Sequence, residues 1–352
     1  MADIKALLKM MLELGASDLF LTAETIPHIK ADGLTRPANV PALGPGESKK
    51  LIYELMNQQQ RNEFETTKES NFALTIDGEA RFRVNVYYQR GEVSAVIRLI
   101  KSTIPSFEEL GLPIQAKELS LLKRGLVLMV GAAGSGKSTT MAAMVGYRAK
   151  MLEGHILTIE DPIEFLFSHG RSIVEQREVG LDTLTFGDAL RNAMREAPDV
   201  IVIGEIRDRE TAQNAIMYAE AGALCLSTMH SNNANQAIDR IINFFPEEAR
   251  KQVLLDLSLN LKGVISQRLL PGLNSKQVLA TEILLQSAYV TDMIQKGQTD
   301  ALKDAIKKGA DVGMQIFDDC LYTLYKDGRI SKEEAISNAD SHTDLALRIR
   351  LT

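Results

Sequence analysis

A glycine-rich segment carries the clearest chemical signal in the chain. The run from Gly131 to Ser138 matches the pattern G-x-x-x-x-G-K-[ST] at every fixed position. It follows an apolar run and precedes a helical pattern, Thr139–Val145, which is the context that a phosphate-binding loop requires. The residues predicted to hold ATP are Gly131, Gly134, Ser135, Gly136, Lys137, Ser138 and Thr139, with the Ser138 hydroxyl also a predicted ligand of Mg²⁺. A dinucleotide fingerprint is excluded because it would need glycine where Thr139 stands.

Three further apolar runs each end in polar residues. They are Ile156–Ile159 before Glu160 and Asp161, Val200–Ile203 before Gly204 and Glu205, and Leu224–Met229 before His230. In open α/β sheets, ligands bind beyond the carboxyl ends of the strands. If these strands are parallel neighbours of Leu126–Val130, their polar side chains share one crevice with the phosphate loop. Taken singly, each could instead be an ordinary polar residue at a strand end. Together they supply what ATP hydrolysis needs, although Gly204 stands where an aspartate commonly completes the Mg²⁺ site.

A basic strand forms a second candidate feature. Residues 81–86 alternate strictly, which places Arg81 and Arg83 on one face and apolar side chains on the other. Arg98 follows on the next predicted strand. These arginines either form a solvated polar face or reach a nucleotide held by a neighbouring subunit. Nucleic-acid binding has less support, because Tyr87 and Tyr88 are too few aromatic residues for a stacking platform.

Composition limits the possible classes of protein. The 352 residues predict two domains with a helical appendix. The 40 Lys and Arg against 46 Asp and Glu give a net charge of −6, which disfavours bulk attraction to nucleic acid. No apolar run approaches the roughly 20 residues of a membrane-spanning helix, and the first residues lack a signal-peptide pattern, so we expect a cytoplasmic protein. Cys225 and Cys320 form no C-x-x-C motif, which argues against a disulfide framework or a cysteine zinc site.

The first part of the chain reads as mixed helix and strand. We predict helices to Leu14 and over Ser48–Gln60, and a strand at Asp18–Thr22. Strands over 72–76, 80–88 and 93–99, separated by Asp77-Gly78 and by residues 89–91, indicate an antiparallel sheet. Residues 1–100 therefore form the predicted N-terminal α+β domain. The Pro- and Gly-containing segment 101–124 is the predicted linker.

From residue 125 apolar strands alternate with amphipathic helices, the pattern of a parallel sheet covered on both faces. We assign residues 125–285 to this α/β domain. Residues 286–352 read as helical and form the predicted C-terminal subdomain, with helices at 291–295, 299–308 and 317–325.

Four segments together resemble a known family. They are Gly131–Thr139, Thr158–Glu164, Ala197–Asp208 and Ser227–Asn233, which resemble the four boxes of the secretion and type IV pilus ATPase superfamily. Gly15–Leu21 and Gly313–Asp319 are similar to the type IV pilus retraction ATPases. The resemblance covers essentially the whole chain. It implies a PAS-like N-terminal domain followed by a RecA-like P-loop ATPase domain.

The resemblance also implies roles for the site residues. Glu160 would be the catalytic carboxylate, Glu205 would support Mg²⁺ through water, and His230 would couple the terminal phosphate to domain movement. Arg81, Arg83 and Arg98 lie where the family's N-terminal domain contributes arginines to the pocket. The family implies a homohexameric ring that acts on a platform protein of the inner membrane, at the cytoplasmic base of the pilus.

Within the superfamily, the sequence favours retraction over extension or export. It has neither the long extra N-terminal domain nor the tetracysteine zinc motif of the assembly and export ATPases. The ending, Leu345–Thr352, is similar to the accessory branch of the retraction motors, and the segment Asp292–Gly297 matches the main branch imperfectly. An accessory motor implies a second retraction ATPase as a partner.

Two other functions stay open at this point. A RecA-type DNA translocase predicts ATP hydrolysis that single-stranded DNA stimulates. A nucleotide-binding regulatory scaffold predicts that Glu160→Gln and Glu205→Gln leave cellular function intact, whereas a motor would lose it.

Overall fold

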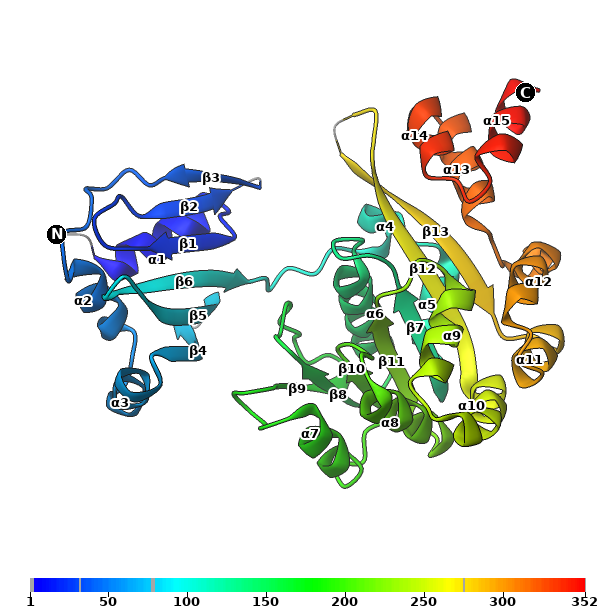
Figure 1. Cartoon of the computed structure of the whole chain (residues 1–352), viewed down its shortest axis with the longest axis horizontal. Helices are drawn as coiled ribbons and strands as arrows, with labels where there is room; N and C mark the ends of the chain where they lie inside the picture. Colours follow the sequence, from blue (N-terminus) through cyan, green and yellow to red (C-terminus); the bar gives the residue numbers. More distant parts are fainter. Residues whose placement is uncertain (1–2, 32, 77–79, 275, 352) are drawn as a thin grey trace. The chain divides into compact units, whose positions relative to one another are not determined.

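The computed structural model describes residues 3–31, 33–76, 80–274 and 276–351. The chain divides into two compact units, whose elements are labelled in Figure 1. Unit 1 comprises Met1–Thr103 and Glu164–Leu166, and unit 2 comprises Ile104–Ile163 and Phe167–Thr352. None of the helices that the structure describes combines the length and apolar character needed to cross a membrane.

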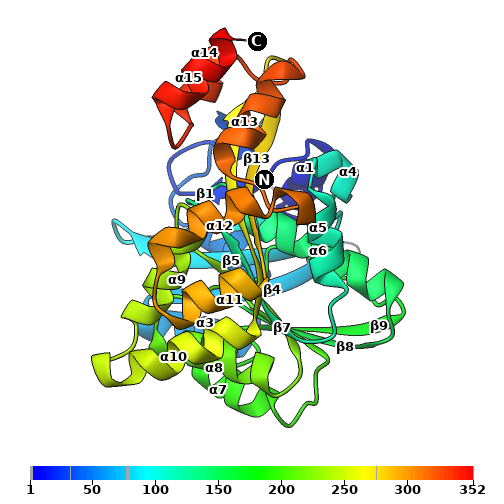
Figure 2. The same ribbon diagram turned by 90° about the vertical axis from the view of Figure 1, so that its right-hand side faces the viewer.

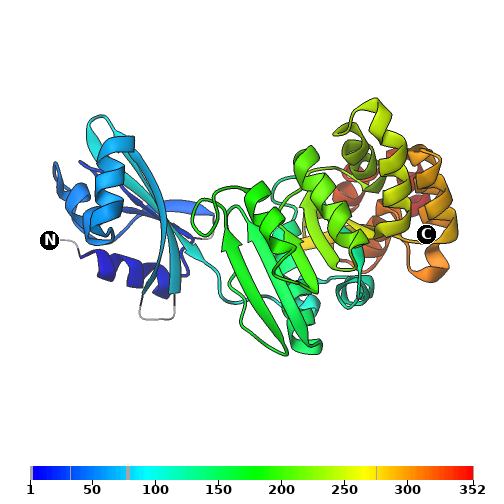
Figure 3. The same cartoon turned by 90° about the horizontal axis from the view of Figure 1, so that it is seen from below.

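Unit 1 is an antiparallel sheet packed with helices, as Figures 1 and 3 show from two directions. Its helices are α1 (Ile4–Glu13), α2 (Glu47–Glu54) and α3 (Gln58–Thr67), and its strands are β1 (Asp18–Leu21), β2 (His28–Ala31), β3 (Leu34–Pro37), β4 (Glu69–Ile76), β5 (Ala80–Gln89) and β6 (Glu92–Ile100). The strand order is β3-β2-β1-β6-β5-β4. The predicted strands therefore pair as an antiparallel sheet, and β2 with β3 extends it beyond the prediction. The predicted turn at Asp77-Gly78 lies outside the described residues.

One predicted helix of unit 1 is divided in two. The sequence predicts a helix over Ser48–Gln60, but α2 ends at Glu54 and α3 begins at Gln58. The Asn57 side chain accepts a hydrogen bond from the Gln60 N–H, and the Gln60 side chain accepts one from the Asn57 N–H. This reciprocal pair satisfies two backbone donors at the start of α3, so a new helix begins there. The prediction of one continuous helix is therefore wrong.

Unit 2 is built on a largely parallel sheet. Its strands are β7 (Gly125–Val130), β8 (Gly154–Glu160), β9 (Ser172–Glu178), β10 (Val200–Ile203), β11 (Leu224–Met229), β12 (Leu261–Pro271) and β13 (Gln277–Leu285). Their order is β13-β12-β7-β11-β10-β8-β9, and β13 alone of these is paired in the antiparallel sense. The four strands predicted for this region, β7, β8, β10 and β11, are adjacent in the sheet and parallel.

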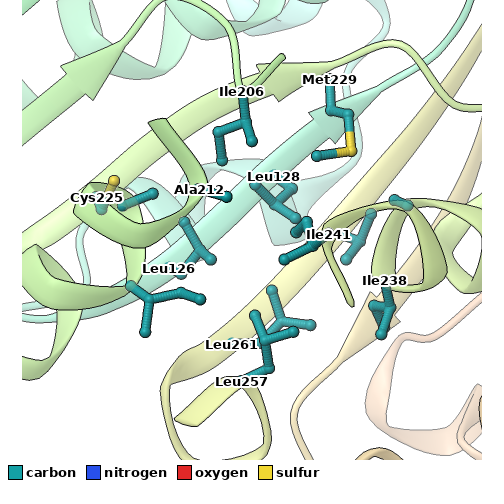
Figure 4. Close-up of a cluster of buried hydrophobic side chains, with 14 of the residues drawn as sticks. Leu126, Leu128, Ile206, Ala212, Cys225, Met229, Ile238, Ile241, Leu257 and Leu261 are labelled. Carbon is teal, nitrogen blue, oxygen red and sulfur yellow. The ribbon is translucent and has the colours of Figure 1, made fainter. Parts of the chain in front are cut away.

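Helices cover both faces of this sheet because its strands are apolar on both sides. The helices are α4 (Phe107–Leu110), α5 (Ile114–Ser120), α6 (Lys137–Met151), α7 (Phe186–Ala193), α8 (Arg209–Glu220), α9 (Ala234–Asn243), α10 (Glu247–Asn260), α11 (Ala288–Gln295), α12 (Leu302–Lys308), α13 (Phe317–Lys326), α14 (Lys332–Ser337) and α15 (His342–Arg350). Leu126 and Leu128 of β7 face the core that includes α8 and α9, part of which Figure 4 shows. Val127 and Met129 face the core with α4, α5 and α6. The buried inner strand β7 thus places the loop that follows it at the carboxyl end of the parallel strands.

Segment 101–124, which the sequence predicted to be a linker, contains two packed helices. Helices α4 and α5 lie within it, and Phe107, Ala116 and Leu119 are buried in the same core as α6. The division between the units falls between Thr103 and Ile104. Most of the predicted linker is therefore part of unit 2, because its apolar residues fill one face of the sheet.

The C-terminal helices pack in two groups rather than one. Residues of α11 and α12, including Val290 and Leu302, join the main core. Phe317 and Leu321 of α13 form a separate cluster with α14, α15 and the strands β12 and β13. Figure 2 shows α13, α14 and α15 side by side near β13. The predicted subdomain 286–352 thus consists of two groups of helices, each packed on a different part of unit 2.

Candidate active site

The phosphate loop connects β7 to α6 through residues in conformations that suit glycine. Gly136, directly before α6, has φ of 88° in the left-handed region, where a side chain is strained. A Cβ on Gly131 would lie 2.3 Å from Ser135 Oγ and 2.6 Å from the backbone oxygen of Gln267. The glycines of the motif therefore allow both the turn and the close approach of neighbouring chain segments.

Lys137 and Ser135 are buried against this loop. Lys137 is 7% exposed, and its Nζ donates hydrogen bonds to Gly131 O at 2.9 Å and Ala132 O at 2.8 Å. Ser135 is 6% exposed, and its buried Oγ has no hydrogen-bond partner within the described part of the chain. Buried hydroxyls normally have a partner, so this orphaned donor in a glycine cradle fits a phosphate oxygen. The residues present therefore fit a nucleotide.

A pocket of about 290 Å³ opens beside the loop. It is lined by Gly131, Ala132, Ala133, Gly134, Ser135, Asn232, Gln267, Arg268 and Leu269. The last three come from β12, which the sequence did not predict as a strand. Gln267 Nε2 donates to Thr140 Oγ1 in α6 at 2.7 Å. No motif marks these β12 residues, because their position depends on pairing with β7, more than a hundred residues earlier.

Glu160 ends β8, next to β10 in the sheet. It is 9% exposed, and its Oε1 accepts hydrogen bonds from Thr158 Oγ1 at 2.6 Å and from Gln176 Nε2 at 3.2 Å. Thr158 lies two residues earlier on the same face of the strand, and Gln176 comes from β9. Thr158 and Gln176 thus hold the carboxylate at the carboxyl end of the sheet, an arrangement that suits a group able to orient a water molecule.

Glu205 and His230 lie close to each other at the ends of β10 and β11. His230 Nε2 is 3.6 Å from Glu205 Oε1, and both side chains are partly exposed. Two hydroxyls bind these strand ends together, Ser227 Oγ donating to Ile203 O and Thr228 Oγ1 donating to Gly204 O, each at 2.7 Å. The structure therefore brings together two residues that lie 25 positions apart in the sequence.

The glycine at the end of β10 has a steric explanation. A Cβ on Gly204 would lie 3.3 Å from Ile159 O and 3.4 Å from Glu160 Cα. Those distances are tighter than nine in ten real Cβ contacts, so a side chain at position 204 would require β8 to shift by a few tenths of an ångström. The acidic residue expected at the end of this strand follows one position later, as Glu205.

The three arginines lie on the sheet of unit 1. The predicted alternation holds, since Phe82 and Val84 are fully buried while Arg81 and Arg83 are only partly buried. Arg83 is opposite Arg98 on β6, and the Arg98 Nε donates to the buried carboxylate of Asp18 at 2.7 Å. Asp18 thus offsets the repulsion between the two facing arginines. The Nε of Arg81 is buried and has no hydrogen-bond partner among the described residues.

The chain is similar in sequence and in fold to secretion and type IV pilus ATPases. The family model described as "Type II/IV secretion system protein" matches residues 1–342. The chain is 49% identical over 350 residues to the type IV pilus ATPase PilU of Pseudomonas aeruginosa strain PAO1, covering 99% of this chain and 92% of that protein. It is 43% identical over 337 residues to the type IV pilus retraction ATPase PilT of the same organism, covering 96% and 98%. The crystal structure of the pilus retraction motor PilT with bound ADP matches with a TM-score of 0.92 and 41% identity, covering 99% of this chain and 100% of that chain.

Proposed function

The chain belongs to the type II/IV secretion system protein family, and from that premise we propose that it is an ATP-hydrolysing motor of type IV pilus retraction. The predicted resemblance to the retraction ATPases is confirmed, and so is the predicted fold class. The identity to PilU is higher than the identity to PilT, which agrees with a motor of the accessory branch. The chain is accordingly an ATPase that couples hydrolysis to mechanical work.

One observation carries this proposal. The phosphate loop, Glu160, Glu205 and His230 follow β7, β8, β10 and β11, which are adjacent parallel strands of one rigid sheet. Their side chains therefore start from the same edge, where ligands of such sheets bind. A phosphate cradle at the same end of the sheet as a buried carboxylate and an acid–histidine pair suits hydrolysis of a phosphoanhydride bond better than binding alone.

Each residue has a role that its surroundings support. Lys137 and the loop N–H groups bind the phosphates of ATP, and Ser138 with Glu205, the latter through water, would hold Mg²⁺. That ion supplies positive charge that offsets the charge of the phosphates. Glu160 orients the attacking water and accepts its proton, since Thr158 and Gln176 fix its carboxylate. His230 responds to the terminal phosphate while paired with Glu205.

We expect a homohexamer in which Arg81, Arg83 and Arg98 of one subunit reach the nucleotide of its neighbour. The ring would act on a platform protein of the inner membrane from the cytoplasmic base of the pilus, beside a second retraction ATPase. No binding to nucleic acid is expected, since the net charge is −6.

Removing the phosphate-binding lysine tests the motor. Lys137→Ala deletes the ammonium group that meets the phosphates, so ATPase activity of the purified chain should fall at least about 100-fold. Cells that carry this variant should retract pili more slowly and with less force, as imaged with labelled pili. The matched control is Lys150→Ala, an exposed lysine near the other end of α6, which should behave as the wild type. Unchanged retraction and pilus number in the Lys137→Ala strain would refute the motor function.

The same purified chain separates the alternative functions. A motor of pilus retraction should hydrolyse ATP at a rate that single-stranded DNA does not raise. Strong stimulation by DNA would support a translocase instead. Normal cellular function of Glu160→Gln and Glu205→Gln would support a regulatory scaffold.

A further inference from the structure

The loop that carries His230 is held at both ends by charged side chains. Arg240 Nη1 of α9 donates to His230 O at 2.6 Å. At the other end, the N–H of Ala234, the first residue of α9, donates to Glu282 Oε1 at 2.8 Å. Between these two bonds lies Asn232, which lines the pocket beside the phosphate loop. The loop between β11 and α9 thus has a fixed start and a fixed end.

Glu282 also binds the strand beside the phosphate loop. Its Oε1 accepts a second hydrogen bond, from Ser266 Oγ of β12 at 2.9 Å. Ser266 is paired with Val130, the last residue of β7, and precedes Gln267, which lines the pocket. A single carboxylate oxygen therefore joins the histidine loop to the strand that borders the phosphate loop.

The phosphate loop and the histidine strand are in direct contact as well. The Gly131 N–H donates to Met229 O, the residue before His230, at 3.3 Å. A shift of the histidine loop would therefore displace Gly131, the first residue of the phosphate loop, through this hydrogen bond. The bond to Glu282 limits such a shift, because it anchors the loop to the sheet on the far side of β7.

Glu282 is buried, so its carboxyl group carries a desolvation cost in the folded state. It is 2% exposed on β13, among apolar side chains such as Leu284. Burial raises the pKa of its carboxyl group, while the bonds from Ala234 and Ser266 act in the opposite direction. The start of α9 is a favourable place for a carboxylate, since helix N–H groups point toward it. An apolar residue of similar size would avoid the desolvation cost but would leave the Ala234 N–H and the Ser266 hydroxyl without this acceptor.

We propose that Glu282 is a positioning residue for ATP hydrolysis, which holds the loop of His230 and Asn232 in register with the phosphate loop. This inference rests on the proposed ATPase function. Glu282 does not touch the nucleotide in this proposal and acts through the loop. Displacing the loop should lower the rate of the chemical step more than the affinity for nucleotide, because small misplacements of reacting groups cost most in the transition state.

Steady-state kinetics of substitutions at Glu282 provide the first test. Glu282→Ala should lower kcat about tenfold or more and leave KM for ATP within about threefold of the wild-type value. Glu282→Gln should recover most of kcat, because an amide oxygen can accept both hydrogen bonds. The matched control is Leu284→Ala, which should lower the thermal midpoint of unfolding and leave kcat close to wild type. An equal loss of kcat in Leu284→Ala would overturn the proposal.

A double-mutant cycle with His230 provides the second test. If Glu282 acts through the histidine loop, Glu282→Ala should lower kcat little further in a His230→Ala background. Additive losses would contradict the proposal, since they would show that Glu282 acts independently. If Glu282→Ala does not fold, Ser266→Ala, which removes one of the two bonds, takes its place in the cycle. An inactive wild-type chain would overturn the proposed ATPase function, whereas additivity in an active chain overturns only the role of Glu282.

Discussion

Neutral hydroxyl and amide groups orient the charged groups of the site. Thr158 and Gln176 donate to Glu160, and Thr228 donates to the backbone oxygen next to Glu205. Such donors hold a carboxylate in one orientation. The Lys137 ammonium group donates hydrogen bonds to two backbone oxygens of the phosphate loop.

Arg268 lines the pocket and also contacts the C-terminal region. Its Nη2 donates to Asp340 Oδ1 at 2.8 Å, another of its N–H groups donates to Asn338 O, and its guanidinium lies 3.8 Å from the centre of the Phe317 ring. Lys303 Nζ donates to Asp340 Oδ2 at 2.9 Å. Asp340, which lies between α14 and α15, therefore binds side chains of both β12 and α12.

Asp340→Asn should destabilise the chain in a pH-dependent way. Burial alone would raise the pKa of Asp340, but hydrogen bonds from Lys303 and Arg268 hold that pKa below its ordinary value of 3.8. The ionised carboxylate therefore stabilises the fold above the unfolded-state pKa, and this contribution is lost as the pH falls through the folded-state pKa. We expect Asp340→Asn to cost about 1.5–3 kcal/mol at pH 7 and progressively less as the pH falls below about 4.

Thermal unfolding at several pH values measures this effect. The control is Asp327→Asn, an exposed aspartate just after α13. Its midpoint should follow the wild type at every pH. A loss of stability in Asp340→Asn that is the same at pH 7 and pH 3 would rule out the ion pair as its cause.

At the scale of elements, the phosphate loop depends on its two neighbouring strands. It leaves the buried β7, its Gly131 N–H donates to Met229 O at the end of β11, and a Cβ on Gly131 would meet the Gln267 backbone oxygen of β12. The loop is therefore shaped by tertiary contacts on both sides as well as by its own glycines.

Gly131→Ala tests that dependence. The added Cβ would lie 2.6 Å from the Gln267 oxygen, and a backbone atom within a sheet cannot move away without breaking strand pairing. We expect nucleotide affinity to fall by about 1–3 kcal/mol or more, measured by titration with a fluorescent ATP analogue, with far-UV circular dichroism unchanged. Gly134→Ala is the comparison, because its Cβ would meet nothing within 4 Å and only its φ of 77° would be strained. Equal losses in the two variants would show that loop conformation, and not contact with β12, is the cause.

Prediction from the sequence succeeded where an element is defined by its own residues. Strands β7 and β10 are apolar throughout, β8 and β11 are apolar apart from a few polar residues, and all four lie where they were predicted. It failed where a contact with a distant segment decides the structure. Segment 101–124 was predicted to be a linker because of its prolines and glycine, yet its apolar residues fill a face of the sheet of unit 2.

At the scale of the whole molecule, the candidate residues are divided between the two units. The arginines belong to the sheet of unit 1, and the phosphate loop and the strand ends belong to unit 2. A nucleotide site that uses both sets can be completed by a neighbouring subunit in a ring, as a head-to-tail interface allows.

Mixing two inactive variants tests a site shared between subunits. Lys137→Ala removes the phosphate ligand, and Arg81→Ala removes an arginine from unit 1. Each variant alone should be nearly inactive, but an equal mixture that exchanges subunits should regain activity at up to about a quarter of its sites, where an intact loop meets an intact arginine. A mixture of Lys137→Ala with Gly131→Ala is the control, because both changes lie in the same loop, and its activity should not exceed the mean of the two variants measured alone. No recovery in the first mixture would show that Arg81 does not act across subunits.

The sequence by itself determined the phosphate loop, the polar residues at the strand ends and the family, because each depends on residues close together in the chain. The positions of Gln267, Glu282 and Arg268 were decided only by the tertiary structure. The Gln267–Thr140 bond spans 127 residues, the Ala234–Glu282 bond spans 48 and the Arg268–Asp340 bond spans 72. Such contacts depend on how distant segments pack together, so the local spacing of residue types cannot predict them.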